Sequence, residues 1–235
     1  MQRFWQLATV GGGPEGLQVL LDGKPIRLPG GATLRLDRPE LAAAIAAEWQ
    51  RAGAAPGGEM SFSDVPLTRL AGTAQERIAP DPAGTVAALA RYGESDLLCY
   101  RGEEPAALAE WQAHAWQPWL DWAAAELGAP LRVTRGITFV PQDEAALAAL
   151  RRAVAAEPPL ALAALGVVVP ALGSLVLGLA LARQRLAAAE ALALASLEEG
   201  FQEEIWGTDA EALARRAAIA GEVATAARLF ELARR

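Results

Sequence analysis

The sequence is poor in three chemically versatile residue types, with one cysteine (Cys99), one histidine (His114) and one lysine (Lys24) among 235 residues. A single cysteine cannot form a disulfide within the chain, which is typical of a reducing compartment. One histidine and one cysteine cannot supply the nitrogen and sulfur ligands of a typical zinc site. A nucleophile activated by histidine is also disfavoured, because His114 is the only histidine that could serve as its base. These shortages disfavour most familiar enzyme designs.

The chain also lacks a surplus of positive charge. It has 21 Lys and Arg residues against 28 Asp and Glu residues, which gives a net charge of -7 and a pI near 4.9. Nucleic-acid binding depends on clustered basic side chains that neutralise phosphates, so we expect no nucleic-acid partner. Hydrophobic residues make up 53% of the sequence, which is enough to bury a core and offset the entropy of the chain.

The N-terminus shows neither the apolar core of a secretion signal nor the pattern of a transit peptide. We therefore expect a cytoplasmic protein. Residues 158–182 carry no charge and are long enough to span a bilayer, but Pro170 and several glycines interrupt them. We expect two short buried helices there, at 160–168 and 172–183, and no stable membrane insertion; a membrane-anchored protein remains the alternative.

The first third of the sequence has the pattern of β-strands. Residues 4–10 are rich in β-forming side chains and lead into a glycine cluster at 11–16, which we interpret as a turn. Asp22-Gly23 separates residues 17–21 from residues 26–28, and this dipeptide between two apolar runs is a strong hairpin signal. The sequence therefore predicts a small antiparallel sheet.

Beyond residue 37 the apolar period changes from two to about three and a half. Asp37 and Glu40 fit a capping box, and Leu41, Ile45 and Trp49 recur at helical spacing. We predict an α+β protein with a β-rich N-terminal domain at 1–65, including one helix at about 38–52, followed by a larger all-helical domain at 66–235. The later helices are expected at 67–78, 82–93, 104–126, 143–156, 160–168, 172–183, 186–205 and 209–233.

One of these later helices has an acidic face that we expect to be exposed. Gly207 is suited to the position just past its end, and Thr208 with Glu211 fits a capping box for the following helix. Adjacent glutamates on a helix point about 100° apart, so they cannot flank one bond as the paired carboxylates of a hydrolase do. The residues of this face are Glu198, Glu199, Gln202 and Glu203.

The aromatic residues gather in one predicted helix. It carries Trp111, Trp116, Trp119 and Trp122, which form either a core or an apolar surface for a partner. His114 lies among them without a serine or cysteine partner nearby, so a solvated or packed side chain is favoured over a catalytic base. Cys99 has apolar neighbours, which is typical of an inert buried thiol.

Short motifs in a consistent order run through nearly the whole chain. They occupy residues 3–5, 19–25, 41–49, 66–71, 92–101, 116–122, 133–137, 172–177 and 197–207. With these motifs the sequence resembles the family of assembly chaperones that bind the free alpha subunit of F-type ATP synthase and promote assembly of its catalytic sector. Two departures are Gln117, where the family has aspartate, and Ala74-Gln75, where the family usually has Ala-Ile-Asp.

The resemblance implies a β-rich domain followed by a helical one, no enzyme activity and no cofactor. It implies that the protein masks the beta-facing surface of the alpha subunit, and that an acidic residue near position 199 is needed. Bacterial members would be cytoplasmic and eukaryotic members mitochondrial. The partner-binding residues expected from it are Glu199 first, then Glu198, Gln202, Glu203, Trp206 and Trp49, the last with a structural role favoured.

An enzyme with a small-molecule pocket at the domain junction remains the alternative function. A monomer is the favoured oligomeric state.

Overall fold

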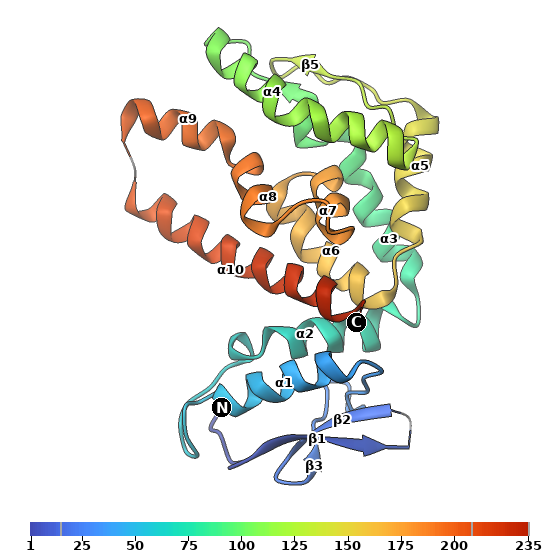
Figure 1. Ribbon diagram of the computed structural model, residues 1–235, viewed down its shortest axis with the longest axis vertical. Coiled ribbons are helices and arrows are strands. Elements are labelled where there is room, and N and C mark those ends of the chain that lie inside the picture. Colours follow the sequence, from blue (N-terminus) through green and yellow to red (C-terminus); the bar gives the residue numbers. More distant parts are fainter. Residues whose placement is uncertain (15, 208, 235) are drawn as a thin grey trace. The chain divides into compact units, whose positions relative to one another are not determined.

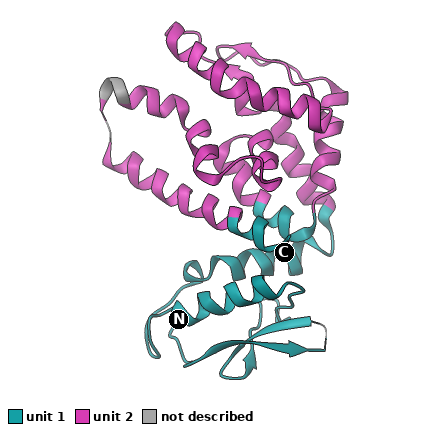
Figure 2. Ribbon diagram, viewed as in Figure 1, with its two compact units in different colours: residues 1–82, 158–164, 228–235 teal, residues 83–157, 165–227 magenta. Residues whose placement is uncertain are grey.

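A computed structural model describes residues 1–14, 16–207 and 209–234, with only the backbone described at 204–206 (Figure 1). The chain divides into two compact units (Figure 2). Unit 1 comprises residues 1–82, 158–164 and 228–235, and unit 2 comprises residues 83–157 and 165–227. Compactness alone does not establish which segments fold independently, so the domain boundary at residue 65 stays a prediction.

Unit 1 contains the predicted antiparallel sheet. Its strands β1 (Ala8–Gly13), β2 (Gly16–Leu21) and β3 (Lys24–Pro25) are joined in the order β1-β2-β3. The turn between β2 and β3 is confirmed at Asp22-Gly23, where both residues have a positive φ, at 46° and 81°. This is the backbone that a tight two-residue hairpin needs, and it explains the Asp-Gly pair.

The glycine cluster is a strand rather than a turn. β1 extends through Gly11, Gly12 and Gly13, which lie opposite β2, so the turn predicted for residues 11–16 is wrong over the first three positions. A Cβ at Gly11 would lie 2.6 Å from the side chain of Leu20. Glycine is used here because the side chain of Leu20, on the neighbouring strand, occupies the space that a side chain would fill.

Helix α1 (Pro39–Arg51) contacts β1 and β2 and covers the sheet. Leu41, Ile45 and Trp49 are buried on it, as their spacing predicts. The capping box predicted from Asp37 is wrong, because the helix begins after Arg38 without a side-chain cap. Pro39 at the first helical position supplies the fixed φ that starts a helix and has no N–H to cap. A short 3-10 turn, η1 (Phe62–Asp64), then leads to α2 (Pro66–Thr73) and its π-helical extension η2 (Ala74–Ile78).

Unit 2 is almost entirely helical, and it includes residues 165–172 of α6 and 210–227 of α10. Its one described strand pair is β4 (Tyr100–Arg101) with β5 (Thr134–Arg135), which run parallel. The remaining elements are α3 (Pro82–Ala90), η3 (Arg91–Ser95), η4 (Leu97–Cys99), α4 (Ala106–Trp122), η5 (Ala123–Leu127), α5 (Glu144–Ala155), α6 (Pro159–Leu172), α7 (Leu175–Ala182), α8 (Ala188–Ala195), α9 (Leu197–Trp206) and α10 (Ala210–Leu232). All eight residues of α7 are buried. This architecture confirms the predicted fold class of a small antiparallel sheet followed by helices.

Two predicted helix boundaries are wrong. Pro170 lies inside α6, and the chain breaks instead at Gly173, whose φ is +63°. A proline in the last turn of a helix removes only a terminal hydrogen bond, whereas a left-handed residue ends the helix. The helix predicted at 186–205 is divided at Ser196, whose hydroxyl donates to the carbonyl of Leu192 at 2.8 Å. None of the described helices is both long and apolar enough to cross a membrane.

Candidate functional site

The acidic face predicted at positions 198–203 lies on α9. In unit 2, α9 contacts α8 and α4, and it runs between α4 and α10 (Figure 1). Glu198, Glu199 and Gln202 are exposed, as expected, but Glu203 is only partly exposed. The side chain of Trp206 lies outside the described residues, and Gly207 follows the helix end with a φ of +87°.

An arginine from the next helix, Arg216 of α10, engages this acidic face. Its Nη2 donates a hydrogen bond to Oε1 of Glu203, and its Nε lies 3.7 Å from Oε2 of Glu199. Glu199 and Glu203 are one helical turn apart, a spacing at which two like charges repel. The guanidinium between them offsets that repulsion, so the face is less negative than its sequence indicates.

The three charged side chains differ in their access to solvent. The exposed fraction is 56% for Glu199, 28% for Arg216 and 19% for Glu203. The hydrogen bond from Glu203 raises the pKa of Arg216, with the charges of Glu203 and Glu199 adding to it, so the arginine stays charged. Its Nε is buried and lacks a hydrogen-bond partner, because Glu199 is too distant to accept from it. Glu203 is therefore the close partner, while Glu199 keeps an accessible carboxylate.

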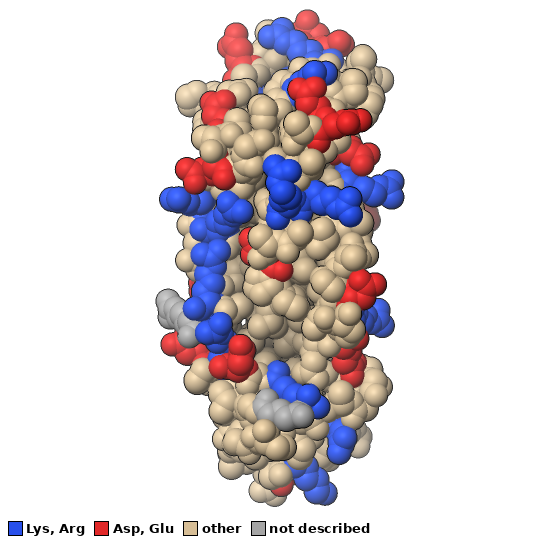
Figure 3. Space-filling view, turned by 90° about the vertical axis from the view of Figure 1, so that its right-hand side faces the viewer, with Lys and Arg blue, Asp and Glu red and all other residues tan. Residues whose placement is uncertain are grey.

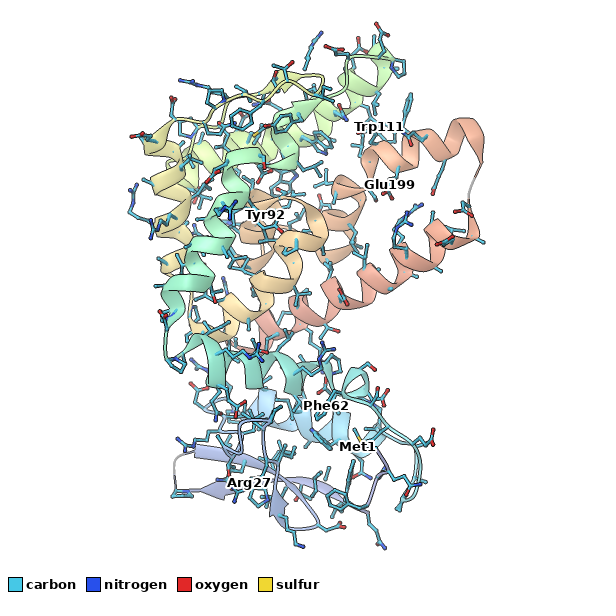
Figure 4. All side chains as sticks on the ribbon, turned by 180° about the vertical axis from the view of Figure 1, so that it is seen from behind. Met1, Arg27, Phe62, Tyr92, Trp111 and Glu199 are labelled. Atoms are coloured by element: carbon cyan, nitrogen blue, oxygen red, sulfur yellow. The ribbon has the colours of Figure 1, made fainter. Side chains whose placement is uncertain are left out.

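The tryptophans of α4 separate into core and surface positions. Trp116 is buried and donates from Nε1 to the carbonyl of Leu194 at 2.9 Å, with the guanidinium of Arg101 5.2 Å from its ring centroid. Trp111 is 41% exposed and packs on Phe201 of α9 with ring centroids 6.1 Å apart. Figure 4 shows Trp111 and Glu199 on these two helices. An exposed aromatic thus lies against the helix that carries the acidic face.

Trp49, the other residue expected at the site, lies in unit 1 and is 4% exposed. Its Nε1 donates to Oγ1 of Thr68 at 2.9 Å, and its carbonyl accepts from Nε1 of Trp5 at 3.0 Å. The neighbouring Glu48 is also buried and accepts from the backbone N–H groups of Leu67 and Thr68 at the start of α2. These contacts join α1 to α2, so an effect of Trp49 on binding would have to act through the folding of unit 1.

A buried carboxylate that sequence reasoning missed joins η4 to α7. Asp96 is 0% exposed and accepts from the hydroxyl of Ser174 at 2.8 Å, from the N–H of Val176 at 3.0 Å and from that of Leu98 at 3.1 Å. Burial raises the pKa of Asp96, while these hydrogen bonds act in the opposite direction. Asp96 therefore supports the N-terminus of α7. The only signal for it in the sequence is its place in the motif at 92–101.

The sequence singled out two further chemically reactive side chains, His114 and Cys99. His114 is exposed on α4. Cys99 is buried, as predicted, and desolvation raises the pKa of its thiol to about 12, with the charge of Asp96 adding to this. Among the residues that the structure describes, no three His, Cys, Asp or Glu side chains are arranged to hold a metal ion.

The face shown in Figure 3 carries both acidic and basic side chains.

Unit 1 has a hollow of about 460 Å³ near the N-terminus. Its lining consists of Met1, Gln2, Glu59, Met60, Ser61 and Asp64. This lining contains no aromatic side chain, whereas small-molecule pockets are lined mainly by apolar and aromatic groups. The alternative of an enzyme with a small-molecule pocket at the domain junction stays a prediction.

Comparison with known proteins gives consistent results. Residues 2–124 match the family described as ATP12 chaperone protein. The crystal structure of Atp12 from Paracoccus denitrificans is 43% identical with a TM-score of 0.91, covering 98% of this chain and 97% of that chain, and an aspartate-to-lysine mutant of the same protein gives the same values. The Agrobacterium tumefaciens protein Atu1473 is 37% identical with a TM-score of 0.91, covering 98% of this chain and 85% of its own.

Proposed function

Because the chain belongs to the ATP12 chaperone family, we propose that it binds the free alpha subunit of F-type ATP synthase and promotes assembly of the catalytic sector. The observation that carries the proposal is the 43% identity to Atp12 over 98% of this chain, with a TM-score of 0.91. The match extends over both units, so it applies to the whole protein rather than to one motif.

A passive shield is the activity that fits this chemistry. An alpha subunit without its neighbours exposes the surface that it will later bury against beta subunits, and exposed apolar patches of this kind aggregate. A protein that covers the beta-facing surface reversibly, at one copy per client, prevents this without turnover or a cofactor. In bacteria such a chaperone acts in the cytoplasm, as a monomer.

The acidic face of α9 is the proposed contact with the client. Glu199 is the first candidate because its carboxylate is 56% exposed, and Glu198 and Gln202 are exposed beside it. Glu203 and Trp206 belong to the same helix, while buried Trp49 acts indirectly. Charged groups at the rim of an interface determine encounter rate and register, and neighbouring apolar groups such as Trp111 supply contact area.

Coexpression with the cognate alpha subunit tests this function. We expect the two chains to elute together in size-exclusion chromatography. Added beta subunit should release the chaperone, because beta subunit binds the same surface of the alpha subunit. Separate elution of chaperone and alpha subunit would refute the function. Coelution that beta subunit does not reverse would refute the masking of the beta-facing surface.

A further inference from the structure

Among the described residues, α9 has contacts with other parts of unit 2 at its N-terminal end and on two sides. On one side Phe201 packs against Trp111 of α4, and at the N-terminal end Leu197 is buried. On the other side, Arg216 of α10 forms ion pairs with Glu203 and Glu199. Arg216 therefore links α10 to α9 through a charged contact.

The two carboxylates do not share that guanidinium equally. Glu203 accepts its hydrogen bond and is 19% exposed, so this carboxylate is occupied and largely withdrawn from solvent. Glu199 lies 3.7 Å from the buried Nε, beyond hydrogen-bond range, and more than half of its side chain is exposed. The sequence presents four similar acidic or amide side chains, whereas the structure separates an anchoring one from an available one.

We propose that Arg216 is a positioning residue for client binding, which fixes α9 against α10 through Glu203 and thereby presents the accessible carboxylate of Glu199 to a cationic side chain of the client. The proposal rests on alpha-subunit binding by α9 as the function. In this proposal Glu203 anchors α9 to α10 and does not contact the client. The client group that pairs with Glu199 is a Lys or Arg side chain.

Hydrogen exchange on the protein alone tests the anchoring without any client. Arg216→Met removes the charge and keeps much of the apolar stem, and we expect it to speed amide exchange in α9 at least about threefold, as expected for loss of a partly buried ion pair. Arg215→Met is the matched control, because this neighbour is exposed and loses the same charge. Equal exchange in α9 for the two variants would overturn the proposal.

Affinity for the alpha subunit tests the positioning. We expect Arg216→Met and Glu203→Gln each to weaken binding about threefold to tenfold, and the double variant to be no weaker than either single one, because both changes break one contact. Arg216→Lys keeps the charge and should recover most of the affinity. Arg215→Met should bind as the unmodified protein does.

The outcomes separate this proposal from the proposed function. If the unmodified protein does not bind alpha subunit, the function fails, while the hydrogen-exchange result still decides the anchoring. If the unmodified protein binds alpha subunit and the Arg216→Met variant binds it equally well, Arg216 does not contribute to binding and the positioning role is refuted. Tighter binding by the variant would also refute it, because Arg216 would then compete with the client. Additive losses in the double variant, with a lowered thermal midpoint, would also refute it, because they indicate general destabilisation.

Discussion

The hydroxyl of Ser174 donates a hydrogen bond to Oδ1 of Asp96 over 2.8 Å and joins positions 78 residues apart. The same hydroxyl accepts from the N–H of Leu177 at 3.0 Å, so it caps α7 while Asp96 accepts from Val176. Every residue of α7 is buried, so its first backbone N–H groups need hydrogen-bond acceptors within the protein. Asp96 and Ser174 supply such acceptors.

Asp96→Ala should lower the free energy of unfolding by about 3 kcal/mol, since it leaves several buried donors without an acceptor. Chemical denaturation measures this change. Glu94→Ala is the matched control, because Glu94 is exposed two residues earlier, and it should change stability by less than about 0.5 kcal/mol. Similar small effects for both variants would show that Asp96 does not support α7.

The thiol of Cys99 should be inert in the folded protein. Its pKa is raised to about 12, so at pH 8 only about one thiol in ten thousand is ionised, and the thiol is also buried. We expect no reaction with a thiol reagent at pH 8 until denaturant is added. Rapid labelling of the folded protein would contradict the burial of this residue.

The same shift predicts a pH dependence of stability. The folded state holds the thiol proton more tightly than the unfolded state, so this contribution is complete below about pH 9 and is lost as pH rises toward about 12. The free energy of unfolding should therefore fall with pH in this window. Cys99→Ala should show a smaller decline, and equal declines in the two proteins would refute the assignment.

Sequence patterns predict the local features of this fold well. The Asp22-Gly23 hairpin follows from the backbone that a two-residue turn demands, and the buried face of α1 follows from the spacing of Leu41, Ile45 and Trp49. The acidic face of α9 was likewise evident as a run of side chains on one helix. Each of these features depends on residues that lie within a few positions of one another.

Features that depend on distant partners were not predicted. Sequence patterns do not indicate that Asp96 accepts a hydrogen bond from Ser174. Nor do they indicate that Glu203 of α9 accepts one from Arg216 of α10. The break at Ser196 was missed because a serine that bonds back to the preceding turn is compatible with a continuous helix. Tertiary contacts decide the Asp96 and Glu203 pairings, and apolar periodicity does not encode them.

Trp49→Leu should destabilise the protein without altering client contact. Truncating an aromatic side chain that is 4% exposed and hydrogen-bonded to Thr68 should cost about 3 kcal/mol. Affinity for alpha subunit, expressed per folded molecule, should stay the same. Trp111→Leu, at a site that is 41% exposed, should cost less than about 1 kcal/mol. Lost affinity in a fully folded Trp49→Leu protein would assign Trp49 a more direct role.

Glu199→Lys should weaken rescue of the client while leaving the thermal midpoint nearly unchanged. The new charge would repel a cationic client group, but the hydrogen bond between Arg216 and Glu203 would remain. Glu222→Lys on α10 makes the same charge change at another exposed position and should preserve rescue. If Glu199→Lys unfolds the protein, or if both variants lose rescue equally, Glu199 is not the contact.

Light scattering by purified alpha subunit tests the shielding function most directly. We predict that an equimolar amount of this protein suppresses the growth of scattering, that a further excess adds little, and that Glu199→Lys fails to suppress it at the same ratio. Alpha subunit that aggregates as fast with the unmodified protein as without it would contradict the account.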